Sequence, residues 1–391
     1  MHDGANGRSR NGNHMIYLAI LSLSITLSLT LTPLAANLGR RWGMVDHPGG
    51  RRQHSGIIPR TGGLAIFLAF GLTVGATLLL PILFPTPFAD WLPPRNDVHE
   101  LRKLTALLLG ATFCTAAGFL DDRYKWSSVP QYFVQVAAAL IAISGFIFLK
   151  HINSPIQAEW LTGNSILLGG ADGLAWWLVW PLTIFWFVGM MNTVNFLDGL
   201  NGLVAGVTAI LCIVLAIHMI FRAEEPQLSV AILPIALLGA VLGFLPFNFS
   251  PARLFTSIPI FMGSSGSYFL GFTIAALGII GGARVAAVML VLGLPILDVA
   301  WLIWQRTRRG RSPNQAGRDH LHFRLLDKGI NARTIVFGYW IFCAIFGTLT
   351  LTIDSRLYKL VALIGLGVVG LGVLVWANSD NKVTKTNRMT R

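Results

Sequence analysis

The sequence predicts an all-α, polytopic integral membrane protein with about eleven transmembrane helices. Of its 391 residues, 54% are hydrophobic and 12% are charged, and soluble domains carry about twice that charged fraction. Apolar runs long enough to cross a bilayer recur along the whole chain. They lie near residues 16–38, 61–85, 104–120, 130–149, 174–191, 200–221, 229–247, 265–282, 285–304, 334–352 and 357–377.

Lys and Arg predict the orientation, because cytoplasmic loops are enriched in them. With the N-terminus outside, 20 of the 30 Lys and Arg fall on the cytoplasmic side, and the C-terminal tail is cytoplasmic. The net charge of +13 then mostly reflects this bias, so nucleic-acid binding is not expected. We expect a disordered arm (1–15), a single transmembrane catalytic domain (16–377) and a cytoplasmic tail (378–391).

The strongest functional signal is a polar ladder between two apolar runs, formed by Asn192, Asn195 and Asp198. At about 100° per residue, a spacing of three places these side chains within one third of a helix circumference, so they can face one site. Unpartnered amides and carboxylates are costly in hydrocarbon, which favours a functional site. Gly199 and Gly202 leave the backbone bare for a ligand. Polar contacts between transmembrane helices are the alternative.

Two adjacent carboxylates, Asp121 and Asp122, end the third predicted span. Adjacent acids at a membrane surface suit a general base or the binding of Mg²⁺. Neighbouring residues diverge by about 100° on a helix, so the two are expected to have separate roles. The alternative is a pair of helix-end charges balanced by Arg123 and Lys125.

Two basic loops complete the polar regions. The first contains Arg51, Arg52 and Arg60, whose guanidinium groups suit phosphate oxygens. The second, 306–324, ends in a run with two histidines spaced by two, which is not the spacing of helical zinc ligands. Contacts to a diphosphate or a sugar are expected instead, and Asp298 is expected to pair with an arginine of this loop.

All these clusters fall on the predicted cytoplasmic side. A transporter would place polar groups near the middle of the membrane and on both sides, so one polar face favours a membrane enzyme. A transporter in which the polar ladder lines an ion pathway remains the rival hypothesis.

Together, the motifs resemble the polyprenyl-phosphate N-acetylhexosamine-1-phosphate transferase family, bacterial enzymes that start O-antigen, teichoic-acid and peptidoglycan lipid synthesis. The resemblance runs in order from Asp46 to Leu325. The matching positions are Asp46, Pro48, Arg51, Pro59, Gly62 and Gly63; Asp121 and Asp122; Asn192, Asn195, Asp198 and Gly199; and His320, His322 and Arg324. The first group is similar to the branch that uses simple UDP-N-acetylhexosamines.

The resemblance implies transfer of N-acetylhexosamine 1-phosphate, above all N-acetylglucosamine 1-phosphate, from a UDP-sugar to undecaprenyl or another polyprenyl phosphate, with release of UMP. It implies a multi-pass protein of the inner (plasma) membrane with a cytoplasmic active site and Mg²⁺ or Mn²⁺ as cofactor; a homodimer is left open. The implied catalytic residues are Asp121, Asp122 and Asp198, with Asp122 and Asp198 as metal ligands. The implied substrate-binding residues are Asp46, Arg51, Arg52, His54, Lys125, Asn192, Asn195, His320, His322 and Arg324.

The sequence departs from the family pattern at three places. Ser264 stands where the family has a metal-associated aspartate, and five extra residues, Thr256–Ile260, precede that motif. Phe323 replaces a histidine and Asn201 an aspartate. The serine predicts either a raised Mg²⁺ requirement or a relative that has lost catalysis.

Overall fold

The computed structural model describes residues 3–47, 56–84, 92–95, 97–153, 165–167, 169–170, 173–174, 176–223, 226–249, 258–281, 285–310, 317 and 319–379. Of those between 3 and 14, of those between 151 and 174, and of residue 379 it describes only the backbone. Within these ranges the protein is built almost entirely of helices. They are α1 (Asp3–Arg41), α2 (Gly62–Leu83), α4 (Glu100–Tyr124), α5 (Ser128–Ser144), α6 (Trp176–Leu197), α7 (Leu203–Ile217) followed by the π-helical turn η1 (His218–Arg222), α8 (Ile232–Asn248), α9 (Gly263–Ile280), α10 (Val285–Val291), α11 (Gly293–Arg308), α12 (Leu321–Asp327), α13 (Ala332–Thr352) and α14 (Arg356–Ser379).

Three short antiparallel hairpins occur among the described residues. They are β1 (Val45–Asp46) with β2 (Ile58–Pro59), β3 (His151–Asn153) with β4 (Ser165–Leu167), and β5 (Gly169–Gly170) with β6 (Gly173–Leu174). The first of them belongs to the candidate site.

The helices confirm an all-α polytopic membrane protein. In the described chain, eight helices are long and apolar enough to cross a membrane, or nine if the bent pair α10 and α11 forms one span. The pair is bent by 78° at its break, and α5 and α8 are shorter apolar helices. Each of the eleven predicted runs thus corresponds to one of these helices, while the number that cross the bilayer and the orientation of the chain stay predictions.

Helix α1 begins at Asp3, within the predicted arm 1–15. The part of α1 that is apolar enough to cross a membrane begins at Met15. The division of the chain into an arm, a catalytic domain and a tail stays a prediction.

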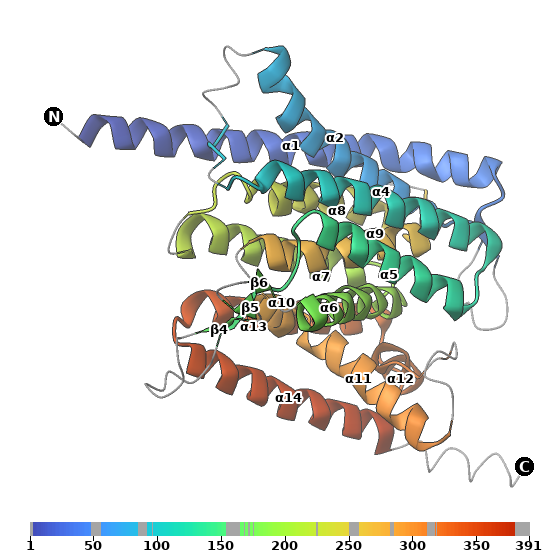
Figure 1. Cartoon of the computed structure of the whole chain (residues 1–391). Helices are drawn as coiled ribbons and strands as arrows, with labels where there is room; N and C mark the ends of the chain where they lie inside the picture. The colour runs from blue at the N-terminus through green and yellow to red at the C-terminus, as the bar shows by residue number, and fades with distance from the viewer. Residues whose placement is uncertain are drawn as a thin grey trace, which may run out of the picture.

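Helix α9 lies at the centre of the bundle and α14 at its edge. Of the most apolar part of α9, 89% of the residues are buried, against 22% in α14. Figure 1 shows α1 and α14 along opposite edges, with α9 between α4, α8 and α7. Small residues let α9 approach its neighbours: a Cβ at Gly271 would lie 2.6 Å from the Met191 Cα of α6. Close backbone approach is typical of helices packed within membranes, and it places the first turn of α9 at the polar site.

Candidate active site

The loop after α1 is fixed against the segment before α9 by backbone hydrogen bonds. Strands β1 and β2 pair with each other, and the Arg60 N–H donates to the Met44 carbonyl at 3.0 Å. The Phe261 N–H donates to the Pro59 carbonyl at 2.8 Å, and the Phe261 carbonyl accepts from Gly62 at 3.0 Å. The backbone is therefore held on both sides of Arg60, which directs this side chain from a fixed base.

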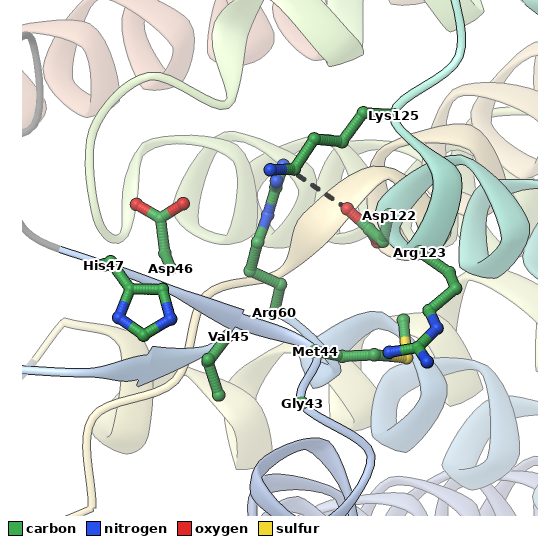
Figure 2. A pocket seen from close by; sticks show the side chains of 9 residues that line it. All are labelled: Gly43, Met44, Val45, Asp46, His47, Arg60, Asp122, Arg123 and Lys125. Carbon is green, nitrogen blue, oxygen red and sulfur yellow. Dashed lines mark ion pairs between the residues drawn. The ribbon is translucent and has the colours of Figure 1, made fainter.

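Arg60 lines a pocket of about 210 Å³ between this loop and the end of α4. Figure 2 shows the side chains of Arg60 and Lys125 directed toward each other near Asp122, with Asp46 farther along the strand. Arg123 also lines the pocket. Three cationic side chains and two carboxylates in one small space suit a ligand that carries several phosphate oxygens. The predicted site residues Asp46, Asp122 and Lys125 thus share one pocket.

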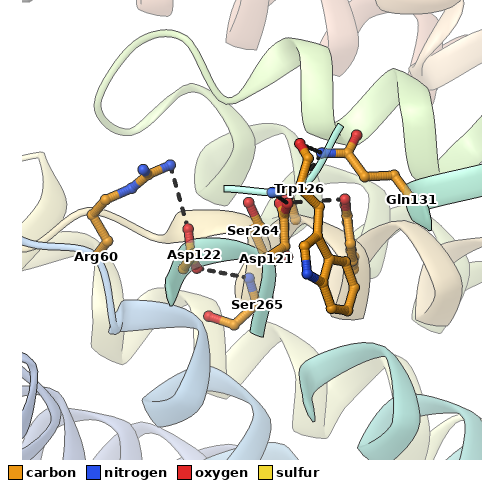
Figure 3. A network of polar contacts seen from close by, with 9 residues as sticks. Arg60, Asp121, Asp122, Trp126, Gln131, Ser264 and Ser265 are labelled. Carbon is orange, nitrogen blue, oxygen red and sulfur yellow. Dashed lines mark hydrogen bonds and ion pairs between the residues drawn. The ribbon is translucent and has the colours of Figure 1, made fainter. Parts of the chain in front are cut away.

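Asp122 forms the inner wall of this pocket. Its Oδ1 lies 3.3 Å from Nη2 of Arg60, and its Oδ2 accepts the N–H of Ser265, at the start of α9, at 3.2 Å (Figure 3). The Asp122 side chain has no exposed surface, whereas 27% of the Arg60 side chain is exposed. The ion pair therefore joins a buried carboxylate to a guanidinium group that a ligand can reach.

Glycines allow the first turn of α9 to contact this acid. Gly263 has a positive φ of 75°, and a Cβ there would lie 2.5 Å from the Asp122 carboxylate and 2.2 Å from the Arg60 carbonyl oxygen. A Cβ at Gly118 of α4 would lie 2.4 Å from the Ser264 carbonyl oxygen. A side chain at either glycine would push α9 away from α4 and open the site.

Asp121 turns the other way. Its Oδ1 accepts the Trp126 N–H and the Gln131 amide, both at 3.1 Å, and its Oδ2 accepts the Tyr268 hydroxyl at 3.4 Å. Figure 3 shows Asp121 and Asp122 directed to opposite sides of α4. The two acids do have separate surroundings, and neither forms an ion pair with Arg123 or Lys125 in the described part of the chain.

Asp198 follows the last turn of α6, where its N–H donates to the Val194 carbonyl at 3.2 Å. Burial raises the pKa of Asp198 to about 7, the negative charge of Asp122 acts in the same direction, and Arg60 opposes them. Asp198 therefore lies within electrostatic range of both Arg60 and Asp122.

Asn248 holds the turn that follows Asp198. Its side-chain oxygen accepts the Gly202 N–H at 2.6 Å, and its amide donates to the Ile260 carbonyl at 2.9 Å. Gly202 has a φ of 82°, a left-handed conformation that favours glycine. Asn248 thus ties the turn between α6 and α7 to the segment before α9.

Asn192 and Asn195 differ in their surroundings. Asn192 exchanges two amide hydrogen bonds with Gln135 of α5, at 2.9 and 3.2 Å, and also donates to the Val188 carbonyl. For this residue the structure matches the alternative of polar contacts between helices. Asn195 is half-buried, and its side chain makes no hydrogen bond to the described residues.

Short helix α12 carries the two histidines beside the end of α6. His320 Nδ1 lies 3.0 Å from an oxygen of Asp298, whose other oxygen accepts the Leu321 N–H at 2.9 Å. Among the described residues Asp298 forms its ion pair with His320 and not with an arginine; it orients His320 and holds the first N–H of α12, as carboxylates do at helix starts. Pairing with Arg311 or Arg318 stays a prediction, because both lie outside the described residues. The His320 ring lies 5.0 Å from that of Phe196.

His322 is buried against the turn after α6. A Cβ at Gly199 would lie 2.1 Å from its Nε2, and its ring lies 4.3 Å from that of Phe323. Neither ring nitrogen has a hydrogen-bond partner among the described residues. Burial lowers the pKa of His322 to about 3, so the ring is neutral at physiological pH. Gly199 and His322 thus bring the Asn192–Gly199 motif and the His320–Arg324 motif into direct contact.

Arg324 is buried among helices and does not line the pocket. Its guanidinium donates to the side-chain oxygens of Gln305 (2.8 Å), on α11, and of Asn378, on α14. Burial lowers the pKa of Arg324. In this state its hydrogen bonds connect three helices.

The remaining predictions divide into two groups. Asp46 is buried and Lys125 exposed, and both line the pocket. The predicted substrate ligands Arg51, Arg52 and His54 lie outside the described residues.

The donor set near Arg60 fits Mg²⁺. Asp122 Oδ1 is buried and accepts no hydrogen bond within the described chain, and Asp198 interacts with it electrostatically. No group of three acidic, His or Cys side chains able to hold a metal occurs among the described residues. Mg²⁺ commonly takes one or two carboxylates and completes its shell with water and substrate phosphates, so two carboxylates suffice.

Sequence reasoning missed residues that position the site. Gln131 and Gln135 contact two of the motifs, and Asn248 connects two loops. The signal was present for the glutamines, since two amides one turn apart in an apolar helix require partners. Arg60 was noted only as one of several basic residues.

Comparison with known proteins agrees with the motifs. Residues 104–282 match the model of glycosyl transferase family 4. The chain is 31% identical to decaprenyl-phosphate N-acetylglucosaminephosphotransferase of Mycobacterium tuberculosis, over 79% of this chain and 75% of the relative. It is 29% identical to a probable undecaprenyl-phosphate N-acetylglucosaminyl 1-phosphate transferase of Bacillus subtilis, over 85% and 84%. It is 24% identical to undecaprenyl-phosphate alpha-N-acetylglucosaminyl 1-phosphate transferase of Escherichia coli, over 80% and 77%.

Proposed function

The chain belongs to glycosyl transferase family 4, and from this premise we propose that it transfers N-acetylglucosamine 1-phosphate from UDP-N-acetylglucosamine to a polyprenyl phosphate, releasing UMP. The names of its relatives in Bacillus, Mycobacterium and Escherichia support the sugar phosphate and the lipid acceptor. The observation that carries the proposal is the pocket at Arg60 and Asp122, with Asp198 within electrostatic range.

The reaction joins two anions. An oxygen of the lipid phosphate attacks the β-phosphorus of the UDP-sugar, a new P–O bond forms, and the bond from that phosphorus to the bridging oxygen breaks to release UMP. Catalysis of such a transfer depends mainly on positioning and on neutralising charge. Arg60, Arg123 and Lys125 supply positive charge along the pocket, and the fixed backbone around Arg60 holds this charge in place.

Asp122 and Asp198 would hold Mg²⁺, which when bound neutralises the diphosphate. Asp121 is assigned a supporting role, because both of its oxygens are engaged by Trp126, Gln131 and Tyr268. Of the two adjacent acids, Asp122 is therefore the one that acts on the ligands in this proposal.

The proposed location is the inner (plasma) membrane with the site on the cytoplasmic face, in accord with 20 of the 30 basic residues on that side. All three cysteines are buried, so a cysteine introduced at Ser379, at the end of α14, can be labelled selectively. Labelling only from the cytoplasm is expected. Labelling from outside would reverse the orientation. The oligomeric state stays a prediction.

The decisive experiment measures UMP release by the purified protein with polyprenyl phosphate, Mg²⁺ and a panel of UDP-sugars. Release with UDP-N-acetylglucosamine is expected. Solute flux measured in the same liposomes tests the transporter hypothesis. Flux without UMP release would refute the enzyme.

A second candidate is a family member that has lost catalysis. Ser264, in the first turn of α9 beside Asp122, favours it, because a hydroxyl is a weaker partner for Mg²⁺ than a carboxylate. Absence of UMP release with every UDP-sugar, from protein that remains folded, would support this candidate.

A further inference from the structure

Helix α5 carries two glutamines one turn apart, at positions 131 and 135. Residues four apart lie on the same face of a helix, so both amides can be directed toward neighbouring helices. Helix α5 packs against α4 on one side and α6 on the other. Asp122 of the site lies on α4, and Asp198 directly follows α6.

Gln131 contacts the Asp121–Asp122 motif. Its amide donates to Asp121 Oδ1 at 3.1 Å and to the Trp126 carbonyl at 3.4 Å. Asp121 in turn accepts the Trp126 N–H. Gln131 thus fixes the end of α4 and the turn into α5, directly beside Asp122.

Gln135 contacts the polar ladder. It is 1% exposed and forms a reciprocal pair with Asn192, in which each amide donates once and accepts once. A buried amide that loses its partner pays the full cost of desolvation. Two hydrogen bonds in opposite directions also fix the axial position of α5 relative to α6 more closely than a single bond does.

We propose that Gln131 and Gln135 are positioning residues that hold the two catalytic motifs at a fixed separation, with α5 as the connecting element. Gln131 acts through Asp121 on its neighbour Asp122. Gln135 acts through Asn192 on Asp198, which directly follows the last residue of α6. The role given to these residues rests on the proposed function, and it assigns Asn192 to the framework and not to the substrate.

The first test is kinetic and uses UMP release under saturating Mg²⁺. In Gln135→Leu, kcat should fall by about tenfold to a hundredfold, because small displacements of catalytic groups cost rates of this size. The KM values for both substrates should change little, since no ligand contact is removed. Gln131→Leu should lower kcat in the same manner.

Exchange of the two amides separates positioning from substrate contact. Gln135→Asn and Asn192→Gln together keep one donor and one acceptor on each side and conserve the total volume. The double variant should recover most of the kcat lost in either single variant. A double variant as slow as the slower single variant would overturn the proposal, because Asn192 would then be needed for itself.

Trp186→Phe serves as a matched control. Its indole N–H donates to the Ala275 carbonyl at 3.0 Å and joins α6 to α9, so the variant removes a contact between helices that touches none of the motifs. It should lower the unfolding temperature and leave kcat unchanged. If Trp186→Phe slows turnover as much as Gln135→Leu does, the kinetic effect is unspecific and the proposal fails.

A second test does not require activity. Unfolding temperatures of Gln135→Leu, Asn192→Leu and the double variant form a cycle, and the shift of the double variant should be smaller than the sum of the single shifts. Additive shifts would show that Gln135 and Asn192 are not coupled, and would overturn the proposal even if the wild type releases no UMP. Conversely, a wild type that releases no UMP with any UDP-sugar refutes the proposed function alone. The cycle of unfolding temperatures then still tests whether Gln135 and Asn192 are coupled.

Discussion

The pocket beside the start of α9 and the short helix α12 both contain polar residues of the motifs, but these residues have different kinds of partner. At the start of α9, Asp122 and Arg60 form an ion pair whose arginine is open to the pocket. On α12, the Arg324 guanidinium donates to Gln305 and to Asn378, and His322 is buried. A polar residue in a motif can therefore serve the reaction or the framework, and its partners distinguish the two roles.

The largest expected effect on turnover comes from replacing Asp122. Asp122→Asn removes the charge that faces Arg60, so turnover should fall by about a hundredfold or more, as expected for loss of a preorganised charged group. Asp121→Asn should cost less than about tenfold, because its amide oxygen can still accept from Trp126 and Gln131 while its N–H donates to the Tyr268 hydroxyl oxygen. UMP release by both variants measures the contrast.

Asp354→Asn is the control for this pair. Its side chain is 85% exposed and pairs with Arg222, so turnover should match that of the wild type. Equal losses in Asp121→Asn and Asp122→Asn would contradict the assignment of separate roles.

Arg324 provides the second test. Arg324→Lys keeps the charge but cannot reach two amide oxygens on different helices. We expect a loss of about 2 kcal/mol in unfolding free energy, the size of a lost hydrogen bond to a charged group, with KM for the UDP-sugar unchanged. Thermal unfolding and UMP-release kinetics measure the two quantities. A raised KM with unchanged stability would return Arg324 to the substrate ligands.

Ser264 sharpens the comparison at the other region. A carboxylate binds Mg²⁺ more strongly than a hydroxyl, so Ser264→Asp should lower the Mg²⁺ concentration for half-maximal turnover by about tenfold. Removal of Mg²⁺ with EDTA should abolish turnover in both proteins. Binding of Mg²⁺ measured by calorimetry checks the same shift without turnover. Coincident titrations would show that this position does not contact the metal.

Hydropathy predicted the helices well, because a bilayer requires long apolar runs whatever the tertiary structure. The bend between α10 and α11 was not predictable in this way. The break lies at Leu292, and at Gly293, the next residue, a Cβ would lie 2.5 Å from the Leu366 side chain of α14. The bend therefore stands in close contact with a helix that is distant in sequence. Hydropathy also did not indicate that α5 and α8, with 17 residues each, are shorter than the other apolar helices.

The motifs predicted which residues gather, and the structure adds their partners. Spacing indicated that Asp121 and Asp122 diverge, but only the position of α5 shows that Asp121 is the one engaged by Gln131. Similarly, the partners of Arg324 come from α11 and α14, far away in sequence from α12. Such contacts depend on the tertiary packing, which no local pattern encodes.

The smallest expected effect concerns His322 and pH. Because burial lowers its pKa to about 3, the unfolded chain takes up a proton below its ordinary pKa of about 6.5 while the folded protein does not. Acidification therefore favours unfolding, and between pH 7 and pH 5.5 this histidine should cost about 1 kcal/mol of stability.

In His322→Gln that part of the pH dependence should disappear. Phe323→Leu, which alters the packing of the same ring and keeps the histidine, should retain the slope of the wild type. Unfolding free energies of the three proteins at both pH values decide the matter: parallel changes in all three would show that His322 titrates normally and is reached by water.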